Sequence, residues 1–216
     1  VVDESGSMNT EHGWLAGMIS ALDAALAAAA GTDPFNAQYG LTGFGGGSGH
    51  TAGHQHNVGG GELGTAAEFG LATPGLVLNG GTEDGYSGLS KALTYTPSQT
   101  GAIKNLILVT DDDRDNFGGP SKAAMASALG GSLLNAVING QARCSDSSVA
   151  LGVDSTGTGY KADGAGGFTT CSGASFVSAF GTTIADYVDL AFGTGGAAWD
   201  LNQLRAGGLT ATSFTA

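Results

Sequence analysis

The chain has 216 residues, of which 40 are glycine and 4 are proline, and 12% carry a charged side chain. This length is enough for one sizeable hydrophobic core, and the glycines follow no fixed period, which excludes a collagen-like fibre. With 19 acidic against 7 basic residues, the formal net charge is -12. The acidic balance argues against nucleic acid and anionic membrane surfaces as partners, because both need basic clusters. No apolar run approaches the length of a membrane span, so we expect no membrane insertion by this chain.

An acid and two hydroxyls occupy alternate positions directly after the first strand. Val1-Val2 is typical of the end of a buried strand, and Asp3, Ser5 and Ser7 follow it. A turn that leaves a strand can aim alternate side chains at one point. A carboxylate with two hydroxyls suits a hard, oxygen-seeking cation such as Mg²⁺. Taken alone, the string also fits an ordinary Asx or Ser turn.

A helix and a second strand are expected next. Apolar residues recur at helical spacing over 15–26, and Gly31 provides a stop for that helix. Residues 37–44 are typical of a strand that runs into three consecutive glycines.

The glycine-rich residues 45–61 contain three of the four histidines, His50, His54 and His56. On a strand, the His-x-His pair would place both imidazoles on one side, which is a usable fragment of a Zn²⁺ or Cu²⁺ site. However, neither a cysteine nor a carboxylate lies within this run, and flexible glycines make ligands costly to preorganise. We therefore expect an exposed polar hairpin.

Two further oxygen-bearing side chains lie at predicted strand ends or in the loops after them. Thr82 stands ahead of a helical pattern over 86–93, and Asp111 ends an apolar run over 106–110 of the buried parallel-strand type. Alone, such a threonine is often a helix N-cap, and such an acid is often merely solvated. Together with the first loop, they occupy the places where ligands bind in open α/β sheets.

The pattern D-x-S-x-S, followed by a distant Thr and a distant Asp, resembles the metal-ion-dependent adhesion site (MIDAS) of the von Willebrand factor type A (VWA) domain. The resemblance implies that Asp3, Ser5, Ser7, Thr82 and Asp111 hold one Mg²⁺, or Mn²⁺ or Ca²⁺ in its place. It also implies a function without enzymatic activity. An acidic group of a protein or other acid-bearing ligand would complete the metal's coordination, giving metal-dependent adhesion and protein binding.

Asp113 and Asp115 follow Asp111 at alternate positions, and this run resembles the opening of a calcium loop. The match lacks the glycine at the sixth place and the Glu at the twelfth. These acids are therefore candidates for a secondary metal site. The alternative is that they are solvated and add negative potential near the first site.

The later part of the chain continues the alternation of strands and helices. A helix opens at Pro120, and a fifth strand is expected over 133–138. Apolar residues over 180–191 restore a helical pattern, a Thr-Gly-Gly turn ends it, and a strand over 197–201 follows. A closing helix would begin at 212–216. This alternation predicts a doubly wound, mostly parallel sheet flanked by helices, the Rossmann-like VWA fold.

Residues 139–175 are predicted to be a hairpin-like insertion after the fifth strand, with 149–153 pairing against 167–170. Cys144 and Cys171 bracket most of this segment, so we expect a disulfide. The alternative is two buried free thiols. The whole chain, 1–216, reads as a single VWA domain that contains this insertion and whose first strand and final helix are cut short.

The few bases, the even cysteine count and the tail over 198–208 favour an exported protein at the cell surface or outside the cell. That tail resembles bacterial exported VWA domains attached to sorting signals. Two alternatives stay open for the function. One is a Mg²⁺-dependent aspartyl-nucleophile phosphatase, although Ser5 stands where such an enzyme has its second acid. The other is a VWA module with a purely structural role. A serine hydrolase is disfavoured, because Leu89 replaces the second glycine of G-x-S-x-G.

Overall fold

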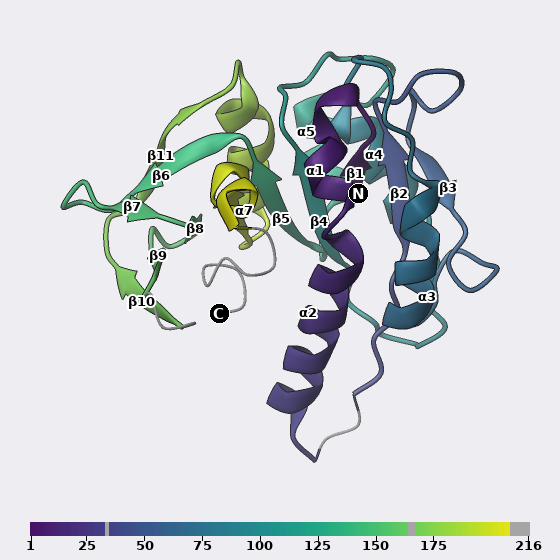
Figure 1. Cartoon of the computed structure of the whole chain (residues 1–216), viewed down its shortest axis with the longest axis horizontal. Helices are drawn as coiled ribbons and strands as arrows, with labels where there is room; N and C mark the ends of the chain where they lie inside the picture. The colour runs from purple at the N-terminus through teal and green to yellow at the C-terminus, as the bar shows by residue number, and fades with distance from the viewer. Residues whose placement is uncertain (33–34, 164–166, 208–216) are drawn as a thin grey trace.

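A computed structural model of the chain describes residues 1–32, 35–163 and 167–207. Within these residues the main sheet has nine strands (Figure 1). In spatial order they are β10 (Phe168–Cys171), β9 (Gly159–Ala162), β8 (Gly152–Asp154), β12 (Ala197–Asp200), β5 (Leu133–Ile138), β4 (Asn105–Thr110), β1 (Val2–Asp3), β2 (Leu41–Phe44) and β3 (His54–His56).

The five central strands, from β12 to β2, run parallel, and the strands outside them are antiparallel. Because β1 lies between β2 and β4, the loops that leave the carboxyl ends of β1 and β4 meet at one edge of the sheet. The doubly wound, mostly parallel α/β fold expected from the sequence is confirmed.

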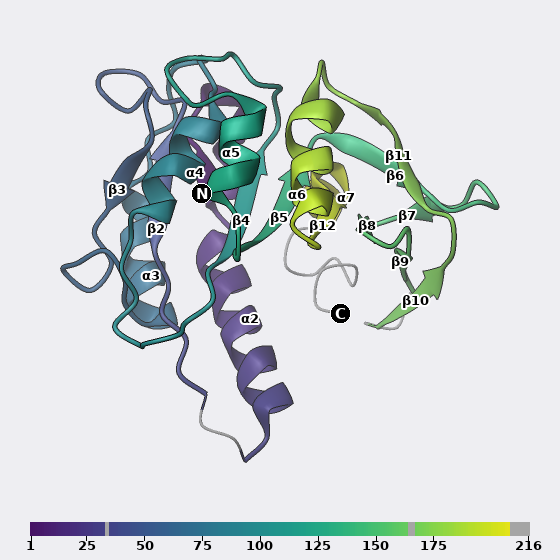
Figure 2. The same ribbon diagram turned by 180° about the vertical axis from the view of Figure 1, so that it is seen from behind.

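Helices cover both faces of the sheet, as Figures 1 and 2 show from opposite sides. One face is covered by α2 (Leu15–Ala30), α3 (Ala66–Ala72) and α7 (Leu201–Gly207), and the other by α4 (Gly85–Leu93), α5 (Lys122–Ala128) and α6 (Asp189–Gly193). Along β4, Leu108 packs into the core beneath α4, whereas Val109 packs into the core beneath α2. A strand buried on both sides explains why its sequence is almost continuously apolar.

Several boundaries agree with the sequence and several elements were not anticipated. The helix expected over 15–26 extends to Ala30 and ends at Gly31, whose φ of +61° suits glycine. The helix α3, the short helix α1 (Asn9–His12) and the helix α7 were not predicted. The strand β3 pairs antiparallel with β2, which agrees with the hairpin expected after residue 44. The closing helix expected over 212–216 lies outside the described residues.

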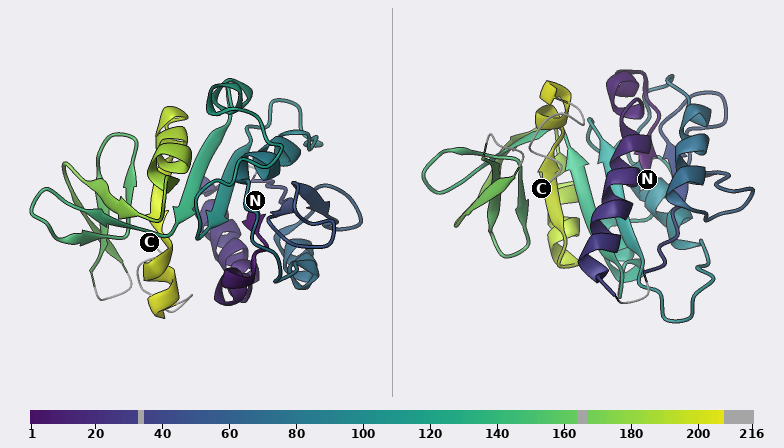
Figure 3. Two further views of the ribbon diagram at one scale, coloured as in Figure 1. Left: turned by 90° about the horizontal axis from the view of Figure 1, so that it is seen from above. Right: turned by 60° about the horizontal axis from the view of Figure 1, so that its bottom comes forward.

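The segment after β5 is more elaborate than a hairpin. It adds β8, β9 and β10 to the main sheet and contributes β6 (Gly140–Arg143) and β7 (Val149–Ala150) to a three-stranded sheet with β11 (Ser175–Ala179). The expected pairing of 149–153 with 167–170 is wrong, because β9 lies between β8 and β10. Both views in Figure 3 show this region projecting beside the parallel core.

The disulfide between Cys144 and Cys171 is confirmed, with 6.0 Å between the two Cα atoms. Cys144 follows β6 of the small sheet, and Cys171 ends β10 of the main sheet. The bond therefore links the two sheets across the inserted segment.

No single helix among the described residues is long and apolar enough to cross a membrane. The bent pair formed by residues 6–12 and Leu15–Ala30 passes such a test by length and composition alone. In the fold, Leu15 and Ile19 of this pair are buried in the core.

Candidate functional site

Four of the five predicted ligand residues lie together at the carboxyl edge of β1 and β4. Asp3 and Ser5 are buried, and Asp111 is 9% exposed. The Oγ atoms of Ser5 and Ser7 are 3.0 Å apart, and the Ser7 hydroxyl donates to Asp111 Oδ1 at 2.9 Å. A continuous hydrogen-bonded line therefore runs from the first loop to the loop after β4.

The carboxylate of Asp3 is fixed on both oxygens. Its Oδ1 accepts from the Ser5 backbone N–H at 2.8 Å, and its Oδ2 accepts from the Thr110 hydroxyl at 2.8 Å. Burial and the nearby charge of Asp111 nevertheless raise the pKa of Asp3 to about 7, against the lowering effect of these hydrogen bonds. The hydrogen bonds of Asp3 therefore do not fully offset the cost of burying its negative charge.

Thr82 lies in the loop ahead of α4 and is half-buried. Within the described residues, no hydrogen bond joins it to the other four predicted ligands. The side chain that caps α4 belongs to Asp84, which accepts from the Tyr86 backbone N–H. The sequence alone did not show which residue caps the helix and which is free to bind a metal, because Thr82 and Asp84 stand two residues apart before the same helix.

Glu83 is an acid of this edge that the sequence reasoning missed. Burial and the charges of Asp3 and Asp112 raise the pKa of Glu83 to about 9. Its Oε2 is buried and has no hydrogen-bond partner in the described structure. A side chain on Gly45 would place its Cβ 2.9 Å from Asp3 Oδ1 and 3.1 Å from Glu83 Cγ, so glycine is what allows the backbone to approach both acids.

The donor set fits a hard divalent cation. It combines carboxylates and hydroxyls, it includes an orphaned carboxylate oxygen, and it carries more negative charge than its hydrogen bonds neutralise. The only basic side chain paired with Asp111 in the described residues is that of Arg205, from α7. Its guanidinium donates to Asp111 Oδ2 and to Glu11 Oε1, both at 2.6 Å.

Asp113 and Asp115 make their described contacts with neighbouring loops. Asp113 Oδ2 accepts from the backbone N–H of Thr182 at 2.9 Å, and Asp115 Oδ2 accepts from that of Glu83 at 2.8 Å. Asp115 thereby fixes the loop that carries Glu83 and Thr82. A secondary metal site at these two acids stays a prediction.

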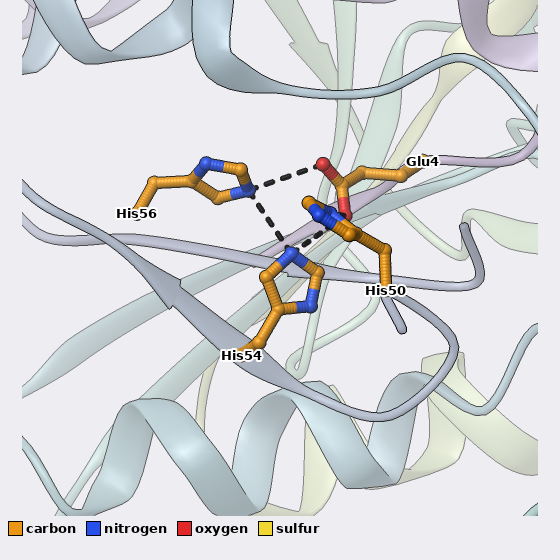
Figure 4. A group of neighbouring side chains, drawn as sticks. All are labelled: Glu4, His50, His54 and His56. Atoms are coloured by element: carbon orange, nitrogen blue, oxygen red, sulfur yellow. Dashed lines mark hydrogen bonds and ion pairs between the residues drawn. The ribbon is translucent and has the colours of Figure 1, made fainter. Parts of the chain in front are cut away.

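A second cluster lies at the neighbouring edge of the sheet, where Glu4 meets His50, His54 and His56 (Figure 4). Glu4 follows β1 directly, His50 lies in the loop after β2, and His54 and His56 lie on β3. One ligand atom of each lies within 4.8 Å of the others. The side chain of Glu4 is fully buried, whereas the side chains of His50, His54 and His56 are 31%, 22% and 10% exposed.

The hairpin expected for these histidines is present, since β3 pairs antiparallel with β2, but its histidines are partly buried against Glu4 and not simply exposed. The expectation of an exposed hairpin depended on the lack of a carboxylate within residues 45–61, and the carboxylate comes instead from Glu4, directly after β1. Burial raises the pKa of Glu4, but hydrogen bonds from His54, His56 and the Val77 backbone N–H lower it by a larger amount, so that the pKa is about 2. Burial lowers the pKa of His54, and its contacts with Glu4 and the Ala52 carbonyl raise it above its ordinary value.

No protein-family model matches the chain, and no curated protein matches it. Among solved structures it is similar to a von Willebrand factor type A protein from Catenulispora acidiphila, with 24% identity, a TM-score of 0.43, and coverage of 64% of this chain and 32% of that one. It is also similar to proximal thread matrix protein 1 from the mussel byssus, with 19% identity, a TM-score of 0.44, and coverage of 64% and 34%.

A third similar structure is an aerotolerance-related membrane protein from Bacteroides fragilis, crystallised with multiple mutations to serines. Here the identity is 16%, the TM-score 0.49, and the coverage 95% of this chain and 92% of that one. The chain thus spans about a third of the length of the first two proteins. Since all three TM-scores are below 0.5, the fold class rests on the strand order and the two helical layers described above.

Proposed function

We propose that this chain is a VWA-type binding module whose acidic edge holds one divalent cation, Mg²⁺ by preference. The single observation that carries the proposal is the hydrogen-bonded line through Ser5, Ser7 and Asp111 beside the buried carboxylate of Asp3. Two loops more than 100 residues apart in the sequence present oxygen atoms to the same place. Hard divalent cations prefer such oxygen donors.

Asp3, Ser5, Ser7 and Asp111 would hold the ion, with Thr82 completing the set from the loop before α4. When bound, the cation supplies a positive centre with a coordination position open to an oxygen atom from a partner. The chain's own groups prepare this edge. Thr110 and the Ser5 backbone orient the Asp3 carboxylate, and Asp115 fixes the loop that carries Thr82.

The partner in this proposal is a protein or other ligand that bears an accessible carboxylate. Two features favour binding over catalysis. A phosphatase of the aspartyl-nucleophile type needs an acid two residues after its nucleophile, and Ser5 stands there with its hydroxyl bonded to Ser7. Of the described arginines near this edge, Arg205 is engaged by two carboxylates and Arg114 by Asp84, so neither is directed to a phosphate site.

An exported or cell-surface location belongs to the same proposal. A disulfide in a chain of this size is typical of oxidising compartments. The low content of basic residues in the sequence points the same way.

The test is calorimetric titration of Mg²⁺ and Mn²⁺ into chelator-treated protein, with Ser7→Ala and Asp111→Ala beside the wild type. We expect one saturable site in the wild type and none in either variant. Ser20→Ala is the matched control, because Ser20 is exposed on α2 and away from the edge. Wild-type protein that is folded by circular dichroism and binds neither ion would overturn the proposal. Metal-dependent turnover of p-nitrophenyl phosphate would favour the phosphatase instead.

A further inference from the structure

We propose that Glu4, His50, His54 and His56 form a second metal site, which takes a zinc-class transition-metal ion and is distinct from the acidic edge. The acidic edge offers only oxygen atoms, whereas this cluster offers three imidazole nitrogens and one carboxylate. Imidazole suits Zn²⁺ and its neighbours in the first transition row, and it does not suit Mg²⁺.

The spacing of the ligand atoms fits one ion. His50 Nδ1 and His54 Nε2 lie 3.2 and 2.9 Å from Glu4 Oε2, and His56 Nε2 lies 3.1 Å from Glu4 Oε1. The Nε2 atoms of His54 and His56 are 3.2 Å apart. Bond lengths of about 2.0–2.1 Å put the ligands of a tetrahedral Zn²⁺ about 3.3–3.4 Å apart. A small outward movement of these side chains therefore makes room for the ion.

The hydrogen bonds of His54 set the direction of its lone pair. Its Nδ1 lies 3.0 Å from the Ala52 carbonyl oxygen, and a carbonyl only accepts, so Nδ1 carries a proton. In neutral His54 the Nε2 atom is then unprotonated, and its lone pair faces the Glu4 carboxylate and the nitrogen of His56. A metal ion at the centre would accept this lone pair and a Glu4 oxygen, taking the place of the proton through which His54 bonds to Glu4. A metal-bound histidine usually donates its other ring N–H to an outer acceptor, and a backbone carbonyl is a common one.

The surrounding backbone holds the ligands in place. Glu4 Oε1 also accepts from the Val77 backbone N–H at 2.8 Å, which fixes the carboxylate. His54 and His56 alternate along β3 and so share one face. Space for the cluster depends on Gly43, where an added Cβ would lie 2.3 Å from Glu4 Oε2 and 2.9 Å from His54 Cε1. The ligands are thus held by strands and not by the flexible glycine run alone.

Four protein ligands fill a tetrahedral ion, which is typical of sites that stabilise structure and leave no position for substrate. Glu4 stands between Asp3 and Ser5 in the chain, so the ion would tie β3 and the loop after β2 to the loop that carries two proposed Mg²⁺ ligands. A metal ion in this cluster would therefore stabilise the loop that carries part of the proposed Mg²⁺ site.

The experiment uses tag-free protein at pH 7, treated with chelator and titrated with Co²⁺ and then Zn²⁺. We expect intense visible d–d bands of tetrahedral Co²⁺, their loss as Zn²⁺ displaces it, and one Zn²⁺ per chain against a chromogenic chelator. His50→Ala and His54→Ala should each weaken Zn²⁺ binding on the order of 100-fold. Gln55→Ala should leave it unchanged, because Gln55 lies between the two strand histidines and bonds to Asn57 and Gly61 instead.

A crossed comparison separates this site from the proposed Mg²⁺ site. Ser7→Ala should bind Zn²⁺ like the wild type and lose Mg²⁺, whereas His54→Ala should show the weakened Zn²⁺ binding and still bind Mg²⁺ like the wild type. His50 lies in an exposed part of the cluster, so its replacement keeps the test valid if another variant fails to fold. Folded wild type without tetrahedral Co²⁺ bands would overturn the proposal. So would a Zn²⁺ affinity that is unchanged in both histidine variants, or Zn²⁺ binding that disappears in Ser7→Ala.

Discussion

Replacing Asp3 by Asn should stabilise the metal-free protein at pH 8 while abolishing Mg²⁺ binding. Burial and Asp111 raise the pKa of Asp3 from 3.8 to about 7. A carboxyl whose pKa is higher in the folded state than in the unfolded state stabilises the fold only while it is protonated. Its ionisation therefore removes stability as the pH rises from about 4 to about 7, and above that range the full cost is present.

The size of the effect follows from that shift. A change of one pKa unit is about 1.4 kcal/mol, so the rise at Asp3 corresponds to about 4 kcal/mol at pH 8. Asn retains an oxygen to accept from the Ser5 N–H, and its amide group can donate to the Thr110 oxygen. We therefore expect the free energy of unfolding of Asp3→Asn to exceed that of the wild type by about 4 kcal/mol at pH 8, and by less than about 1 kcal/mol at pH 4.

The assay is urea denaturation in chelator at both pH values, followed by circular dichroism. Asp189→Asn is the control, because that carboxylate is 56% exposed and lies on the surface. Saturating Mg²⁺ should raise the free energy of unfolding of the wild type at pH 8 and leave that of Asp3→Asn unchanged. Equal stability of the two proteins at pH 8, or a difference of the same size at pH 4, would refute the reasoning that Asp3 is a buried, uncompensated acid.

Three further predictions concern the acidic edge, the inserted segment and the core. Arg205→Gln should raise Mg²⁺ affinity about 5-fold in calorimetry, because Mg²⁺ then binds Asp111 without first breaking its partly exposed ion pair with Arg205. A lower affinity would contradict this. Removing the disulfide with Cys144→Ser and Cys171→Ser should lower the free energy of unfolding by about 3–4 kcal/mol, since the bond spans 27 residues, without changing Mg²⁺ affinity. Leu108→Ala should cost about 2–5 kcal/mol in the same urea assay, because Leu108 is fully buried in a central strand, and a cost below 1 kcal/mol would count against tight packing there.

The parallel core could be predicted because its strands carry a strong signal. The apolar run of β4 is buried on both faces, and Leu133–Ile138 was delimited correctly because glycines precede it and apolar residues fill it. The position of Asp3 and Asp111 at adjacent strand ends followed from the parallel topology alone. The inserted strands were mispaired, because short polar strands such as Phe168–Cys171 have no burial pattern to set their partner.

Local signals were present for some of the missed elements. The helix α3 begins with a capping box, in which Thr65 and Glu68 bond reciprocally, and T-x-x-E before an apolar stretch is readable from the sequence. The histidine cluster was different, because Glu4 lies 46 residues before His50 in the chain. Only the pairing of β1, β2 and β3 brings that carboxylate to the histidines, and the sequence of residues 45–61 does not indicate this contact.

The two-residue strand β1 has a consequence for the order of folding. Val2 pairs with Gly43 on one side and with Val109 on the other, and the Ser7–Asp111 bond joins residues 104 apart. Contacts between such distant residues form late, because the entropy of closing a long loop must be overcome first. A chain still emerging from a ribosome cannot assemble the acidic edge until β4 has been made. Cation binding at this edge would therefore be a marker of completed folding, and its rate after dilution from urea would follow the slowest folding step of the parallel sheet.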